Sequence, residues 1–306
     1  MPGRTDAMAE PRAPTGHPLA GEHRPLYRRL LGPPKRFAAR ALGRAFVSPA
    51  GQHARLQWAR LRAPVRRPDV RVAILAHVYY SELLPEILQL REVLAAPVPI
   101  HLTVPWEKLD DVGDKLAGHP AITLHGCENR GRDVAPFLSV LNAGALDSYD
   151  AVLKVHTKRS PHLRDGEMRR KLLFAMLCGE QKATFRALAA FEDASTGMAG
   201  WRYSFRTHPA YWMANEPKVR EIGARMQAIP AIRLGFFEGS MFWFRPQAFA
   251  ALRALQLAPA DFEAEARQLD ATLHHAIERC FTIAAWSRGF VVRDMHGRPL
   301  GETQRR

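Results

Sequence analysis

The sequence predicts an α/β fold: a single domain with a mostly parallel central sheet flanked by helices, preceded by a basic, partly disordered N-terminal arm. Strand-like and helical segments alternate from residue 71 to residue 156. This alternation is typical of parallel strands joined by right-handed helical crossovers. The first strand-like segment is a nearly continuous apolar run, which favours a strand buried on both faces. With 47% hydrophobic residues among 306, the chain can form a substantial core.

Hydrophobic periodicity and capping residues give the order of the elements. In the first half we expect strands at 71–79, 98–104, 121–125 and 149–156. Between them we expect helices at 81–90 (with Ser81 as N-cap), 106–116 and 134–141. The second half is less regular and predicts a mixed sheet, with strands at 196–201, 236–245 and 290–293. Its expected helices are 167–177, 181–191, 217–226 and 261–285.

Residues 1–68 form the predicted arm, and the folded domain is expected at 69–306. The arm holds 14 Lys and Arg against 3 Asp and Glu, so most of the net charge of +14 belongs to it. Residues 1–25 are rich in proline and lack a hydrophobic period, which predicts disorder. Residues 26–58 fit two short basic amphipathic helices broken at Gly32-Pro33-Pro34. Such helices either attach to an anionic membrane surface or remain a solvated arm.

Charge, hydropathy and cysteine content disfavour several classes of protein. Basic residues are concentrated in the arm and no aromatic–basic motif is present, so we expect no nucleic-acid partner, and an RNA-binding protein is the least favoured reading. No run of 18 apolar residues and no apolar signal segment occurs. The three cysteines lie far apart, so we expect neither disulfides nor structural zinc, and a cytoplasmic location. P-loop, GxGxxG and GxSxG signatures are also absent.

The first candidate site follows the first predicted strand. Open parallel sheets bind ligands at the carboxyl ends of their strands. His77 and Tyr79 lie at such an end. The Tyr79 ring could stack on a nucleobase or simply pack at the sheet edge.

The second candidate site is the segment 128–133, after the third predicted strand. Its central residues suit a tight turn with two arginines beside a helix N-terminus: Asn129, Arg130, Gly131, Arg132 and Asp133. The segment predicts either a phosphate site or a plain turn in which Asp133 caps the helix.

The third candidate site is the end of the fourth predicted strand. Lys154 and His156 share one face of that strand by its period of two. An ammonium group inside an apolar strand costs free energy unless it meets an anion or a carboxylate. The strand continues into Thr157, Lys158 and Ser160. This positively charged strand end predicts a site for a diphosphate.

The fourth candidate site combines two segments. One contains Glu238, Gly239, Ser240 and Trp243. In the other, the expected helix 261–285, Asp270 and His274 lie one helical turn apart, with Glu265 nearby. A carboxylate beside a histidine can serve as a general base. A metal site at His274 and Glu278 is disfavoured, because no further ligand set supports it.

Four longer motifs contain these sites: ENRGRDVAPFL (128–138), LKVHTKRS (153–160), EGSMFWFRP (238–246) and DFEAEARQLDATLHHAIERCF (261–281). In order and spacing they resemble the rhamnan synthesis protein F family, and AHVYYSELLPEI (76–87) fits that family's first strand and helix. The resemblance covers roughly residues 70–293. Members of this family are associated with rhamnose-containing cell-wall polysaccharide and with lipopolysaccharide or O-antigen assembly, and are regarded as glycosyltransferases.

The resemblance implies an inverting hexosyltransferase of GT-A-like fold. Such an enzyme would move a sugar, with rhamnose from dTDP-rhamnose as one candidate, to a polysaccharide or lipopolysaccharide on a lipid-linked acceptor. The first three sites would then bind the nucleotide-sugar donor, and residues 238–243 the acceptor. Asp270, with His274 and Glu265, would be catalytic, by its similarity in position to the acidic residue of inverting GT-A enzymes.

One departure from the GT-A pattern concerns the metal. GT-A enzymes usually end the fourth strand in Asp-x-Asp, which holds a divalent metal on the donor diphosphate. This chain has His156-Thr157-Lys158 there. Fixed cations can stabilise a departing diphosphate instead, so we expect a metal-independent enzyme, with Mg²⁺ or Mn²⁺ as the alternative. The competing hypothesis is a non-catalytic subunit that binds nucleotide sugar or glycan. One structural feature distinguishes the two hypotheses: whether segment 261–285 and the cations of the fourth strand face the same cleft.

Overall fold

A computed structural model of the chain describes residues 33–60, 65–94, 97–157, 166–266, 268 and 270–301. The chain divides into two compact units, residues 1–38 and residues 39–306. The sheet and the helices that cover it belong to the second unit, whereas helix α2, Pro33–Val47, begins in the first. The disorder expected at 1–25 lies outside the described residues. The domain boundary expected at residue 68 stays a prediction.

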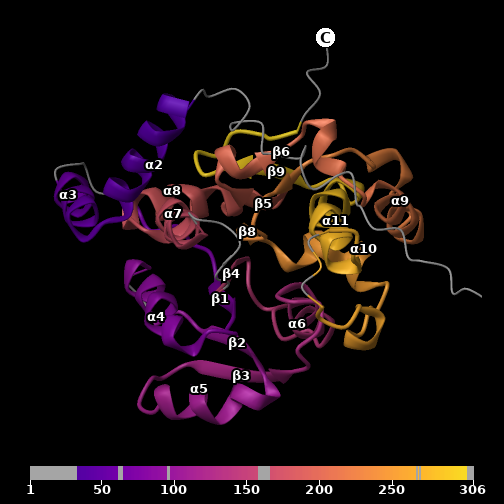
Figure 1. Cartoon of the computed structure of the whole chain (residues 1–306), viewed down its shortest axis with the longest axis horizontal. Coiled ribbons are helices and arrows are strands. Elements are labelled where there is room, and N and C mark those ends of the chain that lie inside the picture. Colours follow the sequence, from indigo (N-terminus) through magenta and orange to yellow (C-terminus); the bar gives the residue numbers. More distant parts are fainter. Residues whose placement is uncertain are drawn as a thin grey trace, which may run out of the picture. The chain divides into compact units, whose positions relative to one another are not determined.

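The second unit is built on a seven-stranded sheet, which confirms the predicted α/β fold (Figure 1). Its strands are β1 Val72–His77, β2 Ile100–Pro105, β3 Ile122–Cys127, β4 Ala151–His156, β5 Thr196–Gly200, β8 Phe242–Phe244 and β9 Val291–Asp294. Their order across the sheet is β3-β2-β1-β4-β8-β5-β9. β1 to β4 pair in parallel, as do β5 and β9. β8 runs antiparallel to β4 and β5, so the expected mixed second half is also confirmed.

Helices cover both faces of the sheet, because successive residues of each buried strand point to opposite sides. On one face, Leu75 and Val152 pack in a cluster with α6 Val134–Asn142, α10 Ala250–Arg253 and α11 Leu273–Ser287. The opposite face packs against α4 Leu84–Val93, α5 Leu109–Lys115, α7 Gly166–Cys178 and α8 Gln181–Ala189. α9, Glu216–Arg225, packs beside α11.

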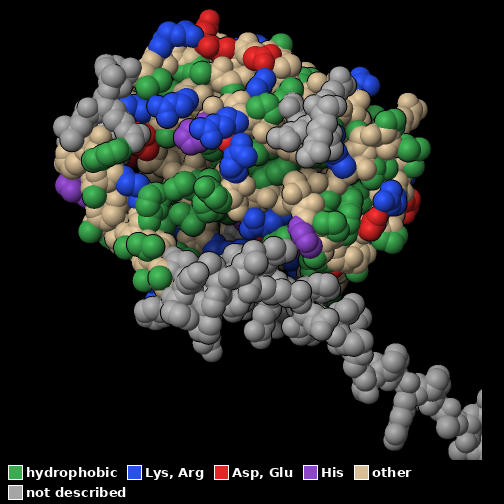
Figure 2. All heavy atoms as spheres, turned by 90° about the horizontal axis from the view of Figure 1, so that it is seen from above, with side chains coloured by type: hydrophobic (Ala, Val, Ile, Leu, Met, Phe, Trp, Pro, Cys, Tyr) green, Lys and Arg blue, Asp and Glu red, His purple; other side chains and the backbone are tan. Residues whose placement is uncertain are grey.

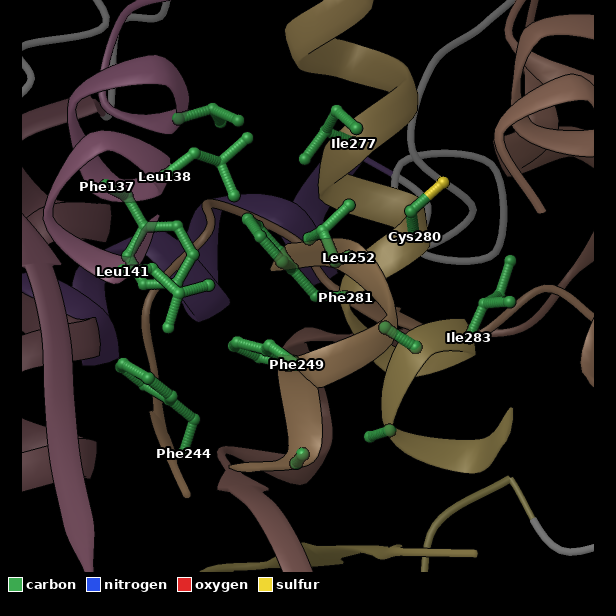
Figure 3. Close-up of a cluster of buried hydrophobic side chains, with 14 of the residues drawn as sticks. Phe137, Leu138, Leu141, Phe244, Phe249, Leu252, Ile277, Cys280, Phe281 and Ile283 are labelled. Carbon is green, nitrogen blue, oxygen red and sulfur yellow. The ribbon is translucent and has the colours of Figure 1, made fainter. Parts of the chain in front are cut away.

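Phenylalanine rings hold α6 and α11 against the sheet (Figure 3). The Phe137 ring of α6 lies 5.4 Å from that of Phe244 in β8 and 5.3 Å from that of Phe281 in α11, centroid to centroid. Both contacts are edge-to-face, the arrangement that the ring quadrupole favours. Truncating such a buried ring to alanine typically costs about 3–5 kcal/mol. This packing fixes the two helices whose N-terminal ends adjoin the site described below.

Two described helices precede the sheet: α2 spans Pro33–Val47 and α3 spans Pro49–Arg60. The helix expected before the break at Gly32-Pro33-Pro34 lies outside the described residues, so that break stays a prediction. Pro33 and Pro34 stand in the first turn of α2, where a missing N–H is tolerated. A break that the sequence did not predict falls at Ser48. Ser48 interrupts the helix because its hydroxyl accepts a hydrogen bond from the Gly51 N–H (3.1 Å), at the start of α3.

Two expectations about local structure are wrong. The segment 236–245 is not one strand: Phe236–Phe237 forms β7, which pairs with β6, Phe205–Arg206, in a separate two-stranded sheet. Gly239 (φ 93°) and Ser240 (φ 53°) reverse the chain before β8, because both occupy the left-handed region. Ser81 is not an N-cap either, since it lies inside a short 3₁₀ turn that leads into α4.

The helix expected at 261–285 begins only at Leu273. The preceding residues form a 3₁₀ turn at Pro259–Asp261 and an irregular segment in which Ala271 has a φ of 66°. The Glu263 carboxylate accepts two hydrogen bonds from the Leu273 N–H (2.9 and 3.1 Å), which satisfies a donor that the first helical turn leaves unpaired. Glu265 and Asp270 therefore lie before the helix, and Asp270 and His274 are not one helical turn apart.

Candidate functional site

The candidate site lies where the strand order reverses, between β1 and β4. The carboxyl ends of these strands are paired, with His77 opposite His156. Beyond them, the buried Thr157 hydroxyl accepts hydrogen bonds from the Tyr79 and Tyr80 N–H groups, both at 3.0 Å. Thr157 thus ties the loop after β4 to the loop after β1. Lys158 and Ser160, expected donor-binding residues, lie outside the described residues.

Lys154 forms the centre of the site. Its ammonium group is 2% exposed and donates to Asp133 Oδ2 (2.6 Å), Ser240 O (2.9 Å) and Ser240 Oγ (2.8 Å). A lysine ammonium has three N–H donors, so these three bonds use all of them. The sequence predicted that the Lys154 ammonium, inside an apolar strand, would meet an anion or a carboxylate. The Asp133 carboxylate is that partner. In this arrangement Lys154 has no donor left for a diphosphate and acts by holding Asp133 and the 239–240 turn in place.

The surroundings of this ion pair make it costly to break. The Lys154 ammonium lies 5.4 Å from the Phe137 ring centroid and 5.8 Å from those of Phe242 and Phe281. In such an apolar setting, removing one partner leaves an uncompensated buried charge, at a typical cost of about 3–5 kcal/mol. The pair also explains why Asp133, at the N-cap position of α6, makes no capping hydrogen bond.

Two histidines border the ion pair. His156 Nε2 donates a hydrogen bond to the Gly239 carbonyl (2.9 Å), so this nitrogen carries a proton. His77 Nδ1 lies 3.0 Å from Thr103 Oγ1. Burial lowers the pKa of His77 to about 4, although the Asp133 charge opposes this shift. His77 is therefore neutral at pH 7.

The 128–133 turn is locked from two sides. Gly131 has a φ of 62°, and a Cβ there would come within 2.6 Å of atoms of Ala135 and Phe262, so only glycine fits. Arg132 donates two hydrogen bonds to the Glu265 carboxylate (3.0 and 3.4 Å) and one to the Gln268 carbonyl (2.6 Å). The arginine expected to meet a phosphate thus binds the irregular segment before α11.

The other residues of this turn are more accessible. Arg130 is half-buried, lies 3.9 Å from a Glu128 carboxylate oxygen, and donates a long hydrogen bond to the Phe262 carbonyl (3.4 Å). Asn129 is exposed. Across the site the Tyr79 ring is half-buried, with the Lys108 ammonium 4.9 Å from its centroid. Tyr79, Asn129 and Arg130 therefore keep surface available to a ligand.

Asp270 lies in the same irregular segment, two residues beyond Gln268. Its carboxylate accepts hydrogen bonds from the Ala214 N–H (3.0 Å) and the Asn215 side-chain amide (2.6 Å). His274 is buried in the first turn of α11 and contacts the Thr272 hydroxyl (2.9 Å) and the His275 ring (4.1 Å between centroids). Asp270 is thus oriented by Ala214 and Asn215, and not by His274 as the sequence suggested.

The residues expected to bind an acceptor occupy two different environments. The Glu238 carboxylate accepts a hydrogen bond from Arg169 (3.1 Å) and one from Arg206 Nε (2.8 Å). Trp243 is fully buried against α7, where its indole N–H donates to the Leu177 carbonyl (3.0 Å). Glu238 and the 239–240 turn border the site, whereas the Trp243 side chain belongs to the core.

Sequence reasoning missed the arginines at the start of α7. Arg170 is buried and donates two hydrogen bonds to the Glu86 carboxylate of α4 (3.1 and 3.0 Å). Its Nη1 is buried without a hydrogen-bond partner in the described part of the chain. Buried guanidinium nitrogens normally find a partner. A basic pair, Arg169-Arg170, in the first helix after the charged fourth strand was the signal that could have revealed it.

Side chains of all four motifs are therefore connected. Asp133 and Ser240 meet at Lys154, and Arg132 binds Glu265. On the face seen in Figure 2, basic side chains lie among hydrophobic and acidic ones rather than in one continuous field. Among the described residues, no group of three or more His, Cys, Asp and Glu side chains could hold a metal ion. Metal independence stays a prediction.

The fold places this chain in the broad class of open α/β domains, in which the carboxyl edge of the parallel strands is the usual position of a functional site. Comparison with known proteins narrows this class. The family model described as "Rhamnan synthesis protein F" matches residues 59–290, and the chain belongs to this family. The resemblance of the four motifs is thereby confirmed.

Two curated relatives carry the same printed name, "Uncharacterized protein WxcX", and come from Xanthomonas campestris pv. campestris strains B100 and ATCC 33913. Each is 32% identical over an alignment of 238 residues, and the match covers 74% of this chain. The match covers 34% of each relative, so the chain spans about a third of their length. No solved structure matches the chain. In the described residues, no helix is both long and apolar enough to span a bilayer.

Proposed function

We propose that this chain is a glycosyltransferase that moves a sugar from a nucleotide-sugar donor to a growing cell-surface polysaccharide or lipopolysaccharide, with rhamnose as the first candidate sugar. The observation that carries the proposal is the connection of four distant motifs at the carboxyl ends of β1 and β4. Membership of a rhamnan synthesis family supports this substrate class.

The donor would lie over the carboxyl ends of β1 and β4. Tyr79 offers a half-buried ring on which a nucleobase can stack. Arg130, which is half-buried, offers N–H donors to the diphosphate. Lys154 is a positioning residue in this scheme, because all three of its N–H groups already donate to Asp133 and Ser240.

Asp270 remains our proposed general base. A carboxylate has about four lone-pair sites, so the bonds from Ala214 and Asn215 orient it and leave acceptor capacity. In an inverting transfer it would take the proton of the acceptor hydroxyl while that oxygen bonds to the anomeric carbon. The bond from carbon to the donor diphosphate breaks at the same time, and the nucleoside diphosphate leaves with the electron pair.

A non-catalytic subunit that binds nucleotide sugar or glycan is the second candidate. One observation favours it: the carboxylates of Asp133, Glu238 and Glu265 are each bound to lysine or arginine. Carboxylates that are paired with lysine or arginine can stabilise the shape of a binding site without taking part in catalysis. This candidate requires donor binding without turnover.

We also propose a cytoplasmic protein that touches the inner face of the membrane through residues 26–58, of which 33–58 are described. α2 exposes the apolar Leu42 side chain (71%) and the basic Arg44, the two kinds of side chain that bind an anionic bilayer. Flotation with phosphatidylglycerol vesicles at low salt tests this. Binding that is equal for the wild type and for Leu42→Ser/Arg44→Glu would contradict it.

Release of nucleoside diphosphate from a panel of nucleotide sugars, in the presence and absence of a lipid-linked glycan fraction, tests the proposed function. We expect one donor to be consumed, and the rate to increase when the acceptor is present. Saturable binding of a donor without any turnover would establish the second candidate. Neither binding nor turnover of any donor would refute both.

A further inference from the structure

A second concave surface lies at the carboxyl ends of β5 and β9, and we call it the β5–β9 groove. It has a volume of about 690 Å³, within the range of roughly 300–1,000 Å³ typical of small-molecule sites. Its walls come from four parts of the second unit: Phe46, Ala54, Arg55 and Trp58; Ala175, Met176, Glu180, Ala183 and Arg186; Trp201, Arg202 and Tyr203; and Asp294, Met295, His296 and Arg298. No step of the proposed transfer uses these residues.

Aromatic rings give the groove its chemical character. Trp58 is 63% exposed and Tyr203 is 74% exposed, while Trp201 is half-buried and packs edge-on against Tyr203, with 5.8 Å between their centroids. Large aromatic side chains that gather in an exposed hollow mark an interaction site more often than an accident of packing. The flat C–H faces of pyranose rings stack on such side chains.

Charged groups stand between the rings. Arg202 Nε donates to the buried Asp294 carboxylate (2.8 Å), which also accepts hydrogen bonds from the His296 and Arg298 N–H groups (2.9 and 3.0 Å). The Arg186 and Arg298 side chains are exposed. Planar guanidinium groups can bind two neighbouring hydroxyls at once. An alkyl chain would leave these polar groups without partners, whereas a chain of sugars offers both C–H faces and hydroxyls.

The groove is linked to the site at β4 by a short stretch of chain. Arg206, three residues after Tyr203, donates a hydrogen bond from Nη1 to the Tyr203 carbonyl (2.9 Å) and binds the Glu238 carboxylate through Nε (2.8 Å) and Nη2. Glu238 directly precedes the turn whose Ser240 binds Lys154. Both surfaces also lie at the same edge of the sheet, because β5 and β9 run parallel to β4.

We propose that the β5–β9 groove is a second glycan site, which holds sugar units of the acceptor chain away from the reacting end. The identity of this ligand as the acceptor rests on the proposed function, but its binding can be measured without turnover. Holding the chain here raises the effective concentration of its terminal hydroxyl at the β4 site.

Titration calorimetry of the full chain with rhamnose-containing oligosaccharides of increasing length tests this proposal. We expect Trp58→Ala and Tyr203→Ala each to weaken binding at least tenfold, with unchanged circular dichroism, since both side chains are mainly exposed. The matched control is Trp106→Ala, which removes another tryptophan that is 61% exposed but lies outside the groove. It should bind like the wild type.

Donor hydrolysis in water separates this inference from the proposed function, because it needs no acceptor. The groove variants should hydrolyse the donor at the wild-type rate if the function holds. Absence of oligosaccharide binding by the wild type, or equal binding by all variants, would overturn the groove proposal and leave the transferase proposal intact. Oligosaccharide binding that depends on the groove residues, without any donor turnover, would support the groove proposal and overturn the transferase proposal. Loss of vesicle binding, and not of glycan binding, in the Tyr203 variant, which lies outside the proposed membrane segment 26–58, would assign the groove to lipid instead.

Discussion

At the scale of single residues, Lys154 shows how one polar side chain can organise a site. It joins β4, the N-terminus of α6 and the 239–240 turn through three hydrogen bonds. We predict that Lys154→Met destabilises the protein by about 3–5 kcal/mol, because it removes the cation that the buried Asp133 carboxylate binds at 2.6 Å. Adding Asp133→Asn should recover much of this loss. Urea unfolding of the single and double variants measures both effects, and equal stability of Lys154→Met and wild type would contradict the assignment.

Asp270 carries the proposed proton transfer. Replacing Asp270 with Asn keeps the shape of the side chain but removes its ability to accept a proton. We expect turnover to fall by a factor of about 10² or more, with donor affinity little changed. Asp110→Asn, an exposed carboxylate in the first turn of α5, is the matched control and should keep full activity. Normal turnover by a folded Asp270→Asn protein would move the role to another residue.

At the scale of elements, the 128–133 turn depends on Gly131. Two glycines with positive φ allow its packing to be separated from its backbone strain: a Cβ at Gly131 meets Ala135 and Phe262 at 2.6 Å, whereas one at Gly118 meets nothing within 4 Å. At either position, the left-handed conformation lowers the stability of an alanine variant by about 1–2 kcal/mol. We expect Gly131→Ala to lose clearly more stability, and donor affinity as well. Equal losses in thermal unfolding would show that the turn is not tightly packed.

The sequence predicted the parallel strands well, because runs such as 71–79 are apolar throughout and need burial on both faces. It also placed His77, the 128–133 turn and Lys154 near the ends of strands, but it left open whether segment 261–285 faces the same cleft. It did not predict the start of α11, where the Glu263 carboxylate and the left-handed Ala271 override a helical pattern. Contacts between residues far apart in the chain, such as Arg132 with Glu265, leave no signal in local periodicity.

At the scale of the whole molecule, buried histidines make stability depend on pH. Burial lowers the pKa of His77 and of His101 to about 4, below the value of about 6.5 of an unfolded histidine. The unfolded state therefore binds more protons between these values, so stability is full above about pH 6.5 and is lost as the pH falls toward 4. We predict a loss of about 2 kcal/mol for each of these histidines between pH 7 and pH 5.

Urea unfolding at the two pH values measures this dependence. The slope should decrease in His101→Gln and remain unchanged in the control His119→Gln, whose side chain is exposed. A stability that does not change between pH 7 and pH 5 would show that the buried histidines gain protons as readily as those of the unfolded chain.

The central claim is that four distant motifs meet in one transfer site, with the donor over the carboxyl ends of β1 and β4. Hydrogen exchange measured by mass spectrometry, with and without the nucleotide sugar that the donor panel selects, tests this claim most directly. We predict slower exchange in peptides that contain Tyr79, Asn129, Thr157 and Ser240, and no change in peptides from the β5–β9 groove. Protection confined to the groove, or to other parts of the chain, would contradict the claim.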